Sequence, residues 1–365
     1  MLESDDFRFI LHLHTTSRQL YVCSELIKIL GVAQLPKSIV DNKIINWSIT
    51  EEQINQTYNK SRGKLTENGK KTTALSHYFQ LCESFGLIIS FNQIYSNSRI
   101  GNVLFNLSSI NSKEGKLHQI ELNFYLFQLL KIDADGLFLI LDFLAEFEEI
   151  NQKKLQQNFK RLLNARLLAK QPHASATVKI IINERFRAIN YIWKSAEKYA
   201  EHLLIPRCEW LITIGILEQR REKSSTLYKF TEIGKEFYDK IPMITDSLKD
   251  INEDWLYSNY FSLLNNLDKK KTREDFSDFS TEKQIEELGK YLEITFSDIK
   301  SSSSFRLPVY ESLLYICLKM FDVDIVINFK DIIATLELGI TYKNKNYRLK
   351  NNGRLNESYI ITRVI

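Results

Sequence analysis

The chain has 365 residues, enough for about two or three domains with proper hydrophobic cores. Hydrophobic residues make up 44% of it and charged residues 26%, with only 12 Gly and 5 Pro, which excludes collagen-like, low-complexity and disordered classes. The 49 Lys and Arg against 45 Asp and Glu give a net charge of +4, too mild by itself to indicate a polyanionic partner.

The cysteines and the first residues indicate the compartment. Cys23, Cys82, Cys208 and Cys317 stand far apart and form no Cys-x-x-Cys pair, which argues against a zinc ribbon or a redox dithiol and predicts buried free thiols. The first residues are acidic where a secretory signal is basic, and no run of about 18 apolar residues occurs. We therefore expect a cytoplasmic protein that does not enter a membrane.

One kind of junction recurs along the chain: an amphipathic helix, a glycine that ends it, and an apolar strand start. Its glycines are Gly86, Gly215 and Gly339, at nearly constant spacing. A glycine after a helix supplies the left-handed cap, and the strand that follows must reverse quickly. The pattern predicts a mainly α chain with small β-hairpins, an α+β fold, built of three similar units with helical connectors. The expected domains are residues 1–115, 116–242 and 243–365.

In the first unit we expect a helix over residues 72–85, because its apolar residues fall at helical spacing. Strands at 87–91 and 102–107 should flank a polar tip at 96–101. This arrangement of helix, glycine and hairpin describes a winged helix.

In the second unit Pro206 is predicted in the first turn of a short helix that continues over 207–214, since proline lacks the N–H that this turn leaves unpaired. After Gly215 we expect a strand, a charged turn at 220–225, a returning strand at 227–230 and a helix beginning near Thr231.

Residues 190–240 resemble prokaryotic winged-helix DNA-binding domains. Their common pattern runs Trp-Leu, Gly-Leu-Leu or Gly-Ile-Leu, a variable wing, and Tyr-x-Phe/Leu-Thr-x-x-Gly. The residues that match it are Trp210, Leu211, Gly215, Ile216, Leu217, Tyr228, Phe230, Thr231 and Gly234. The resemblance implies a helix that enters the major groove and a wing that contacts the DNA backbone or the minor groove.

In the third unit Pro308 should open a helix through residue 321, and Asn328 should cap a helix over 329–338. A long hairpin over 342–362 should follow, with the turn signal Asn352-Gly353 at its centre. Helical connectors are expected over residues 122–132, 136–149, 152–168 and 191–203.

We find no catalytic signature and expect no enzyme activity, no cofactor and no metal. Gly63, Gly69, Lys70 and Thr72 have the wrong spacing for a phosphate-binding loop, so we interpret them as a polar turn before a helix. Asp133 and Asp135 stand where a calcium loop would need them, but Lys131 replaces the first ligand of that loop.

Two further patterns are weak. His12 and His14 alternate on an extended segment, but no third metal ligand stands at a usable spacing, so surface or hydrogen-bonded histidines are the better interpretation. Asp298-Ile299-Lys300, after Glu293, is the nearest match to a nuclease motif that holds Mg²⁺, and it leads into four serines instead of a sheet.

Local charge is more informative than total charge. Residues 151–179 and 340–355 carry many Lys and Arg and no Asp or Glu, and residues 60–71 are also basic. The predicted contacts at the start of the first recognition helix are Lys70, Lys71, Thr72, Thr73 and His77. Those of the second unit are Arg207 on its helix and Arg220, Arg221 and Lys223 on its wing. Those of the third wing are Lys343, Lys345, Arg348, Lys350 and Arg354.

These patterns predict a non-catalytic prokaryotic protein that binds double-stranded DNA, either the DNA-engaging subunit of an antiviral-defence or mobile-element complex or a transcription regulator. The alternative is an interaction scaffold, because winged helices also pair with proteins and the 12% aromatic residues could line an interface with partner subunits. A divergent nuclease that uses Asp298 is a third possibility. The acidic stretch 274–298 should repel DNA, and it could dock a basic partner or fold back over a basic groove.

Overall fold

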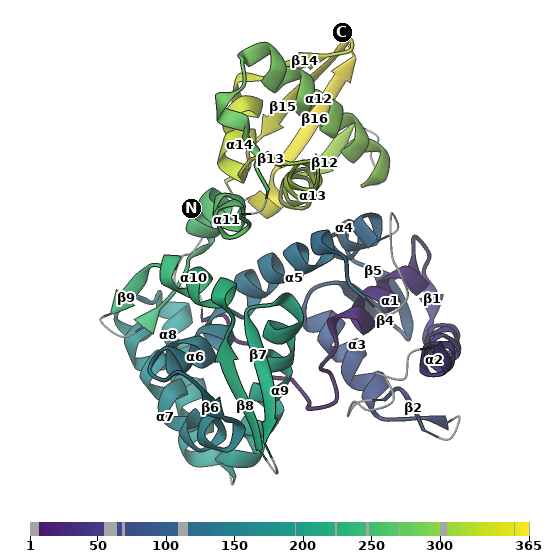
Figure 1. Cartoon of the computed structure of the whole chain (residues 1–365). Helices are drawn as coiled ribbons and strands as arrows, with labels where there is room; N and C mark the ends of the chain where they lie inside the picture. The colour runs from purple at the N-terminus through teal and green to yellow at the C-terminus, as the bar shows by residue number, and fades with distance from the viewer. Residues whose placement is uncertain are drawn as a thin grey trace.

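The fold was derived from a computed structural model. It describes residues 7–54, 64–67, 70–108, 116–193, 195–222, 225–245, 248–269, 271–299, 305–353 and 355–364. Within these residues helices predominate and the sheets are small and mostly antiparallel, which confirms the predicted α+β class (Figure 1). None of the described helices combines the length and the apolarity needed to cross a bilayer.

The first unit covers residues 20–108. Its elements in chain order are α1 (Leu20–Leu30), β1 (Leu35–Pro36), α2 (Lys37–Ile54), β2 (Thr66–Glu67), β3 (Lys70–Lys71), α3 (Ala74–Ser84), β4 (Ile88–Phe91), β5 (Ile94–Asn97) and α4 (Arg99–Ser108). The strands β1, β5 and β4 form one antiparallel sheet in that order. The predicted helix over 72–85 is confirmed as α3.

The predicted wing of this unit is wrong in its second half. Residues 102–107 belong to helix α4 and not to a strand, because Ile100, Val103, Leu104 and Leu107 repeat at helical spacing and are buried on one face. The tip of the hairpin is the two-residue turn 92–93, where both residues have positive φ, and not residues 96–101.

The second unit covers residues 134–240. Its elements are α6 (Ala134–Ala145), β6 (Ile150–Asn151), α7 (Gln152–Lys170), η2 (Gln171–His173), α8 (Ala176–Arg187), the π-helical turn η3 (Ala188–Ile192), α9 (Ala196–Ile214), β7 (Leu217–Glu222), β8 (Ser225–Phe230) and α10 (Glu232–Lys240). Its sheet has the order β6, β8, β7, which corresponds to the order β1, β5, β4 of the first unit: in both, the second strand of the hairpin lies in the middle. The predicted connectors over 136–149 and 152–168 correspond to α6 and α7.

The predicted helix start at Pro206 is wrong, and so is a separate connector helix over 191–203. Pro206 lies inside α9, which begins at Ala196. Proline removes one backbone hydrogen bond there. The helix continues because it buries apolar side chains on both sides of the proline, among them Leu204 and Trp210.

The third unit covers residues 274–364. Its elements are β11 (Glu274–Asp275), η4 (Phe276–Asp278), α12 (Thr281–Asp298), β12 (Arg306–Pro308), α13 (Val309–Asp322), β13 (Ile325–Val326), α14 (Phe329–Leu338), β14 (Ile340–Tyr342), β15 (Lys345–Lys350), η5 (Leu355–Glu357) and β16 (Tyr359–Val364). The predicted helices from 308 and 329 are confirmed, and Asn328 forms a capping box with Asp331. The sheet has four strands in the order β12, β16, β15, β14.

The predicted long hairpin of this unit is in fact three strands. A tight turn at Lys343 and Asn344, both with positive φ, joins β14 to β15. The residues around Asn352-Gly353 then lead from β15 toward β16, which pairs with β15 along its length. The Asn-Gly signal therefore does stand between two paired strands, but a second turn precedes it.

A hydrogen-bonded arrangement, here called the hydroxyl–glycine latch, follows the β4–β5 hairpin of the first unit. The Ser98 hydroxyl donates to the carbonyl of Gly86, which ends helix α3, and accepts a hydrogen bond from the Gly101 N–H at 3.0 Å. A Cβ on Gly101 would lie 2.0 Å from the Leu87 carbonyl oxygen. Only glycine allows α4 to approach this closely.

The second unit repeats the latch with different residues. The Thr231 hydroxyl donates to the Gly215 carbonyl at 2.7 Å and accepts from the Gly234 N–H at 2.9 Å. A Cβ on Gly234 would lie 1.8 Å from the Ile216 carbonyl oxygen. The predicted helix start near Thr231 is confirmed, and the first two units share one local design. In the third unit β16 follows the hairpin where the first two units have the latched helix.

Helix α5 (Gln119–Ile132) lies among the three units (Figure 1). Its Gln128 amide donates to the Phe85 carbonyl of the first unit at 2.9 Å and accepts from the Tyr310 hydroxyl of the third at 3.1 Å. The residues after the second unit form the hairpin β9 (Met243–Thr245) and β10 (Leu248–Lys249) and then α11 (Glu253–Leu267), whose Tyr260 hydroxyl donates to the Asn123 carbonyl at 2.5 Å. The predicted connector over 122–132 is confirmed as α5.

Candidate nucleic-acid interface

The sheet of the third unit has one covered face and one open face. Ile340, Tyr347 and Ile360 are buried on the covered face. Because side chains alternate along a strand, Arg348 and Lys350 lie on the opposite face, and both are exposed.

The strand register gathers further cations on this open face. Arg306 of β12 and Arg348 of β15 lie on either side of Ile361, and Arg363 is opposite Asn346. Arg306 and Arg363 are exposed, and the sequence of the four strands contains no Asp or Glu. We call this surface the basic sheet face. Its residues are Arg306, Asn346, Arg348, Lys350, Tyr359, Ile361 and Arg363.

The predicted third wing is split between the two faces of this sheet. Lys345 Nζ lies 2.9 Å and Lys343 Nζ 3.3 Å from the carboxylate of Glu293 on α12. The hydrogen bond from Lys345 lowers the pKa of Glu293. One residue of the acidic stretch thus folds back on two of the predicted contacts and offsets one of their two positive charges, whereas Arg348 and Lys350 stay on the open face. Arg354 lies outside the described residues.

The start of α3, the predicted first recognition helix, is hydrogen-bonded within the unit. Lys71 forms an ion pair with Asp41, to which Lys37 also binds at 2.8 Å. The Thr72 hydroxyl donates to the Lys64 carbonyl and accepts from the Ala74 N–H at 3.2 Å. Thr73 is exposed, and the side chain of Lys70 lies outside the described part of the chain.

His77 lies at the junction of the first two units. Its ring stacks on that of His14 at 3.9 Å between centroids, and His14 stacks in turn on His202 of α9 at 4.5 Å. The Thr16 hydroxyl lies 2.8 Å from His77 Nδ1. Burial and the neighbouring His77, His202 and Arg18 lower the pKa of His14 to about 4, and burial lowers that of His77. His77, a predicted DNA contact on α3, therefore faces the second unit.

Arg207 is a correction, because its guanidinium has no exposed surface and cannot reach DNA. It forms a bidentate pair with Asp133 at 2.7 and 2.6 Å and donates to the carbonyls of Ile10 and Leu203. Burial raises the pKa of Asp133, although Arg207 acts to lower it. The sequence predicts a helix start at Arg207, whereas it lies in the interior of α9 against α6.

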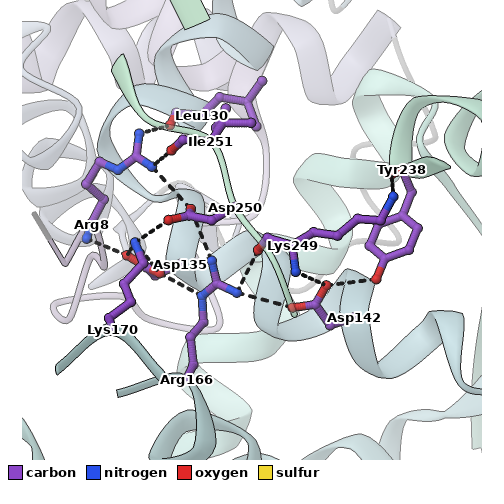
Figure 2. Close-up of polar contacts among 10 residues, drawn as sticks. All are labelled: Arg8, Leu130, Asp135, Asp142, Arg166, Lys170, Tyr238, Lys249, Asp250 and Ile251. Atoms are coloured by element: carbon purple, nitrogen blue, oxygen red, sulfur yellow. Dashed lines mark hydrogen bonds and ion pairs between the residues drawn. The ribbon is translucent and has the colours of Figure 1, made fainter. Parts of the chain in front are cut away.

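A buried cluster of ion pairs joins α6 and α7 in the same unit, and Figure 2 shows its residues. Arg166 is surrounded by Asp135 at 2.6 Å, Asp142 at 3.1 Å and Asp250 at 3.2 Å. Lys170 lies 2.8 Å from Asp135 and 2.7 Å from Asp250. We call these five residues the buried ion cluster. It fixes α7 to α6 and to the segment before α11.

The buried ion cluster changes the charge of the second unit's surface. Burial raises the pKa of Asp142 to about 6, although Arg166 opposes this effect. Two of the cations in the acid-free stretch 151–179, Arg166 and Lys170, serve this internal structure. Lys153, Arg161 and Lys179 stay exposed, so the stretch is less basic at the surface than in the sequence.

Charge on the wing of the second unit is largely compensated. The exposed Arg220 lies 2.9 Å from Glu222 and 3.3 Å from Glu149, and on the neighbouring strands Lys229 pairs with Glu218. Arg221 is exposed. Lys223 lies outside the described residues.

The other candidate sites have structural roles. Asp298 of the nuclease-like motif accepts a hydrogen bond from the Tyr315 hydroxyl at 2.5 Å, and Lys300 lies outside the described residues, as do Gly63 and Gly69. All four cysteines are buried free thiols. Within the part of the chain that the structure describes, no group of three His, Cys, Asp or Glu side chains has a metal-binding arrangement.

Sequence reasoning missed Arg306 and Arg363. They belong to strands that pair only in the folded chain, and the signal was the absence of acids from all four strands. No family model, no curated protein and no solved structure matches the chain significantly.

Proposed function

We propose that the protein binds double-stranded DNA without catalysing a reaction, and that the basic sheet face supplies its main phosphate contacts. The observation that carries this proposal is the position of Arg306, Arg348, Lys350 and Arg363 on one open face. Neighbouring strands lie about 5 Å apart, so these cations form one continuous surface. Clustered Lys and Arg on one surface are what phosphate neutralisation requires.

The composition of the face favours nucleic acid over a protein partner. The cores of protein interfaces are depleted of charged residues, whereas DNA-binding surfaces are polar and positively charged. Asn346 and Tyr359 stand among the cations and offer hydrogen-bonding groups to sugar or phosphate oxygens.

We further propose that the units are winged helices in tandem. The shared sheet order of the first two units and the repeated latch support this proposal. Several such units on one chain suit a cytoplasmic prokaryotic protein, either the DNA-engaging subunit of a defence or mobile-element complex or a transcription regulator.

The test compares two pairs of cations on the same hairpin. Arg348→Ala with Lys350→Ala removes two charges from the basic sheet face, and Lys343→Ala with Lys345→Ala removes two charges that share the single carboxylate of Glu293. Binding to a random duplex is measured by fluorescence anisotropy across a salt series. We expect the first pair to reduce the slope of log affinity against log salt by about 2 and the second pair to reduce it by no more than about 1, because Glu293 offsets one of its two charges.

Two results would overturn the proposal. One is equal loss from both pairs, and the other is no binding of the parent chain at low salt. Circular dichroism of each variant confirms that it is folded.

An interaction scaffold is a second candidate, favoured by exposed apolar side chains on α8 and the turn after it. Ile180 is 61%, Tyr191 81% and Ile192 69% exposed. Binding through such a surface would change little with ionic strength, so the same salt series applied to any partner subunit separates the two functions.

A further inference from the structure

An apolar cavity of about 170 Å³ lies between the N-terminal segment, α7, α8 with its π-helical turn, and α9. Phe7 and Phe9 stack on each other at 5.7 Å, and Trp193 and Tyr199 stack at 4.7 Å with an angle of 13°. All four line the cavity. The surroundings are therefore those of a pocket for a flat apolar group.

Arg185 is the permanently charged residue of the lining. Burial lowers its pKa, and only the nearby Glu184 acts to raise it. Within the described residues its guanidinium has no hydrogen bond and no ion pair, whereas the buried Arg166 and Arg207 of the same unit each have a carboxylate at 2.6 Å. A partly buried guanidinium beside an apolar cavity is suited to an anion from outside the chain.

The backbone at the cavity wall is unusual. Residues 188–192 form a π-helical turn, closed by a hydrogen bond of 3.0 Å from the Trp193 N–H to the Ala188 carbonyl. Ala188 and Ile189 of this turn line the cavity. Such turns are rare, and they occur frequently at functional sites.

We propose that this cavity binds a small aromatic carboxylate, with its ring among Phe9, Trp193 and Tyr199 and its carboxylate on Arg185. An apolar cavity of about 150 Å³ accommodates benzene, so the space fits one ring. The carboxylate supplies the planar pair of acceptors that a guanidinium binds in bidentate fashion. This site is separate from the basic sheet face and does not depend on the proposed function.

The cavity lies where a ligand would affect the joint between units. Its wall residues Phe7 and Phe9 alternate with Arg8 and Ile10, and the backbone N–H of Ile10 donates to Asp133 at 2.8 Å. Arg8 binds the Leu130 carbonyl at 3.0 Å and Asp250 at 3.3 Å. A ligand on one side of this segment therefore stabilises its contacts on the other side.

The experiment titrates the full chain with benzoate and indole-3-carboxylate, followed by tryptophan fluorescence and calorimetry. Benzamide, which has the shape of benzoate without its charge, is the matched control ligand. We expect saturable binding of at least one carboxylate with a dissociation constant of about 1 mM or below, and at least about tenfold weaker binding of benzamide.

Two variants locate the site. Arg185→Gln should weaken carboxylate binding at least about tenfold, and Arg187→Gln, on the exposed side of the same helix, should leave it unchanged. The proposal is overturned if neither carboxylate binds saturably up to about 10 mM, if benzamide binds equally well, or if folded Arg185→Gln binds as the parent does.

Discussion

The first two units differ from the third in how they use the same surfaces. In the first two, the helices α3 and α9, expected to read DNA, meet each other through His77, His14 and His202. In the third, an added strand completes a four-stranded sheet whose open face carries Arg348 and its neighbours. The polar side chains of the first two units thus join parts of the chain to each other, whereas the sheet of the third unit keeps several cations exposed.

The largest expected effect comes from breaking the buried ion cluster of the second unit. Asp135→Asn leaves Arg166 and Lys170 partly unpaired without solvent to replace the carboxylate. We expect a loss of about 3–5 kcal/mol in the free energy of unfolding, measured by urea titration. Glu222→Gln, which among the described residues removes an exposed ion pair with Arg220, is the control and should cost at most about 1 kcal/mol. A loss of similar size in both variants would contradict the structural role of the buried ion cluster.

The latch provides the next prediction and tests whether the first two units are equivalent. Gly101→Ala and Gly234→Ala each place a Cβ against a backbone carbonyl oxygen. Each should cost about 2–3 kcal/mol in the same titration, because the backbone must shift to relieve the overlap. Thr177→Ala on the exposed surface of α8 should stay within about 0.5 kcal/mol. If only one of the two glycines is sensitive, the latch is not a shared device.

The stacked side chains of His14, His77 and His202 predict a moderate dependence of the chain's stability on pH. Because the pKa of His14 is about 4 in the folded chain and higher when unfolded, the unfolded state binds more protons between these values. Stability therefore falls as the pH drops from about 6.5 toward 4. The pKa of Asp142 is raised to about 6, so the folded state takes up its proton before the unfolded state does. This effect increases stability as the pH falls below about 6.

Substitution separates these two effects. In His14→Gln the urea midpoint should drop less between about pH 7.5 and pH 5 than in the parent chain. The exposed His12→Gln is the matched control and should behave as the parent does. An unchanged pH dependence in His14→Gln would show that the junction does not titrate in this range.

The smallest expected effect is on the wing of the second unit. Arg220 is paired with Glu149 and Glu222, so Arg220→Ala should change affinity for a duplex less than about threefold. The measurement is the anisotropy titration used for Arg348 and Lys350. A larger loss than for that pair would move the main DNA contacts from the third unit to the second.

Sequence alone predicted what depends on neighbours in the chain. The cap at Asn328, the helix ends at Gly86 and Gly215 and the helix after Thr231 are set by short-range chemistry, and all are present. Helix α4 is not predicted, because the polar residues 96–101 favour a turn while the apolar residues that follow repeat at helical spacing. In the structure the helical spacing decides.

Partners distant in the chain could not be predicted. Arginine is a residue type that commonly contacts DNA, so the sequence favours Arg207 as a contact. Only its pairing with Asp133, at the start of α6, shows that it is internal. Arg306 and Arg348 come together because β16 lies between their strands, a register that no local signal specifies. Of the four cations on the basic sheet face, the sequence therefore predicts Arg348 and Lys350 but not Arg306 and Arg363.

The contacts of Arg8 have a consequence for how the chain folds as it is made. Arg8 donates to the carbonyl of Ile251, which follows it by 243 residues. Synthesis proceeds at about 5–20 residues per second, so this partner emerges on the order of tens of seconds after Arg8. Until then the segment that carries Phe7, Arg8 and Phe9 lacks its contacts with the residues that follow the second unit. The segment around Arg8 is therefore made early and fixed late, because its contacts with Asp250 and Ile251 form only after the second unit has been synthesised.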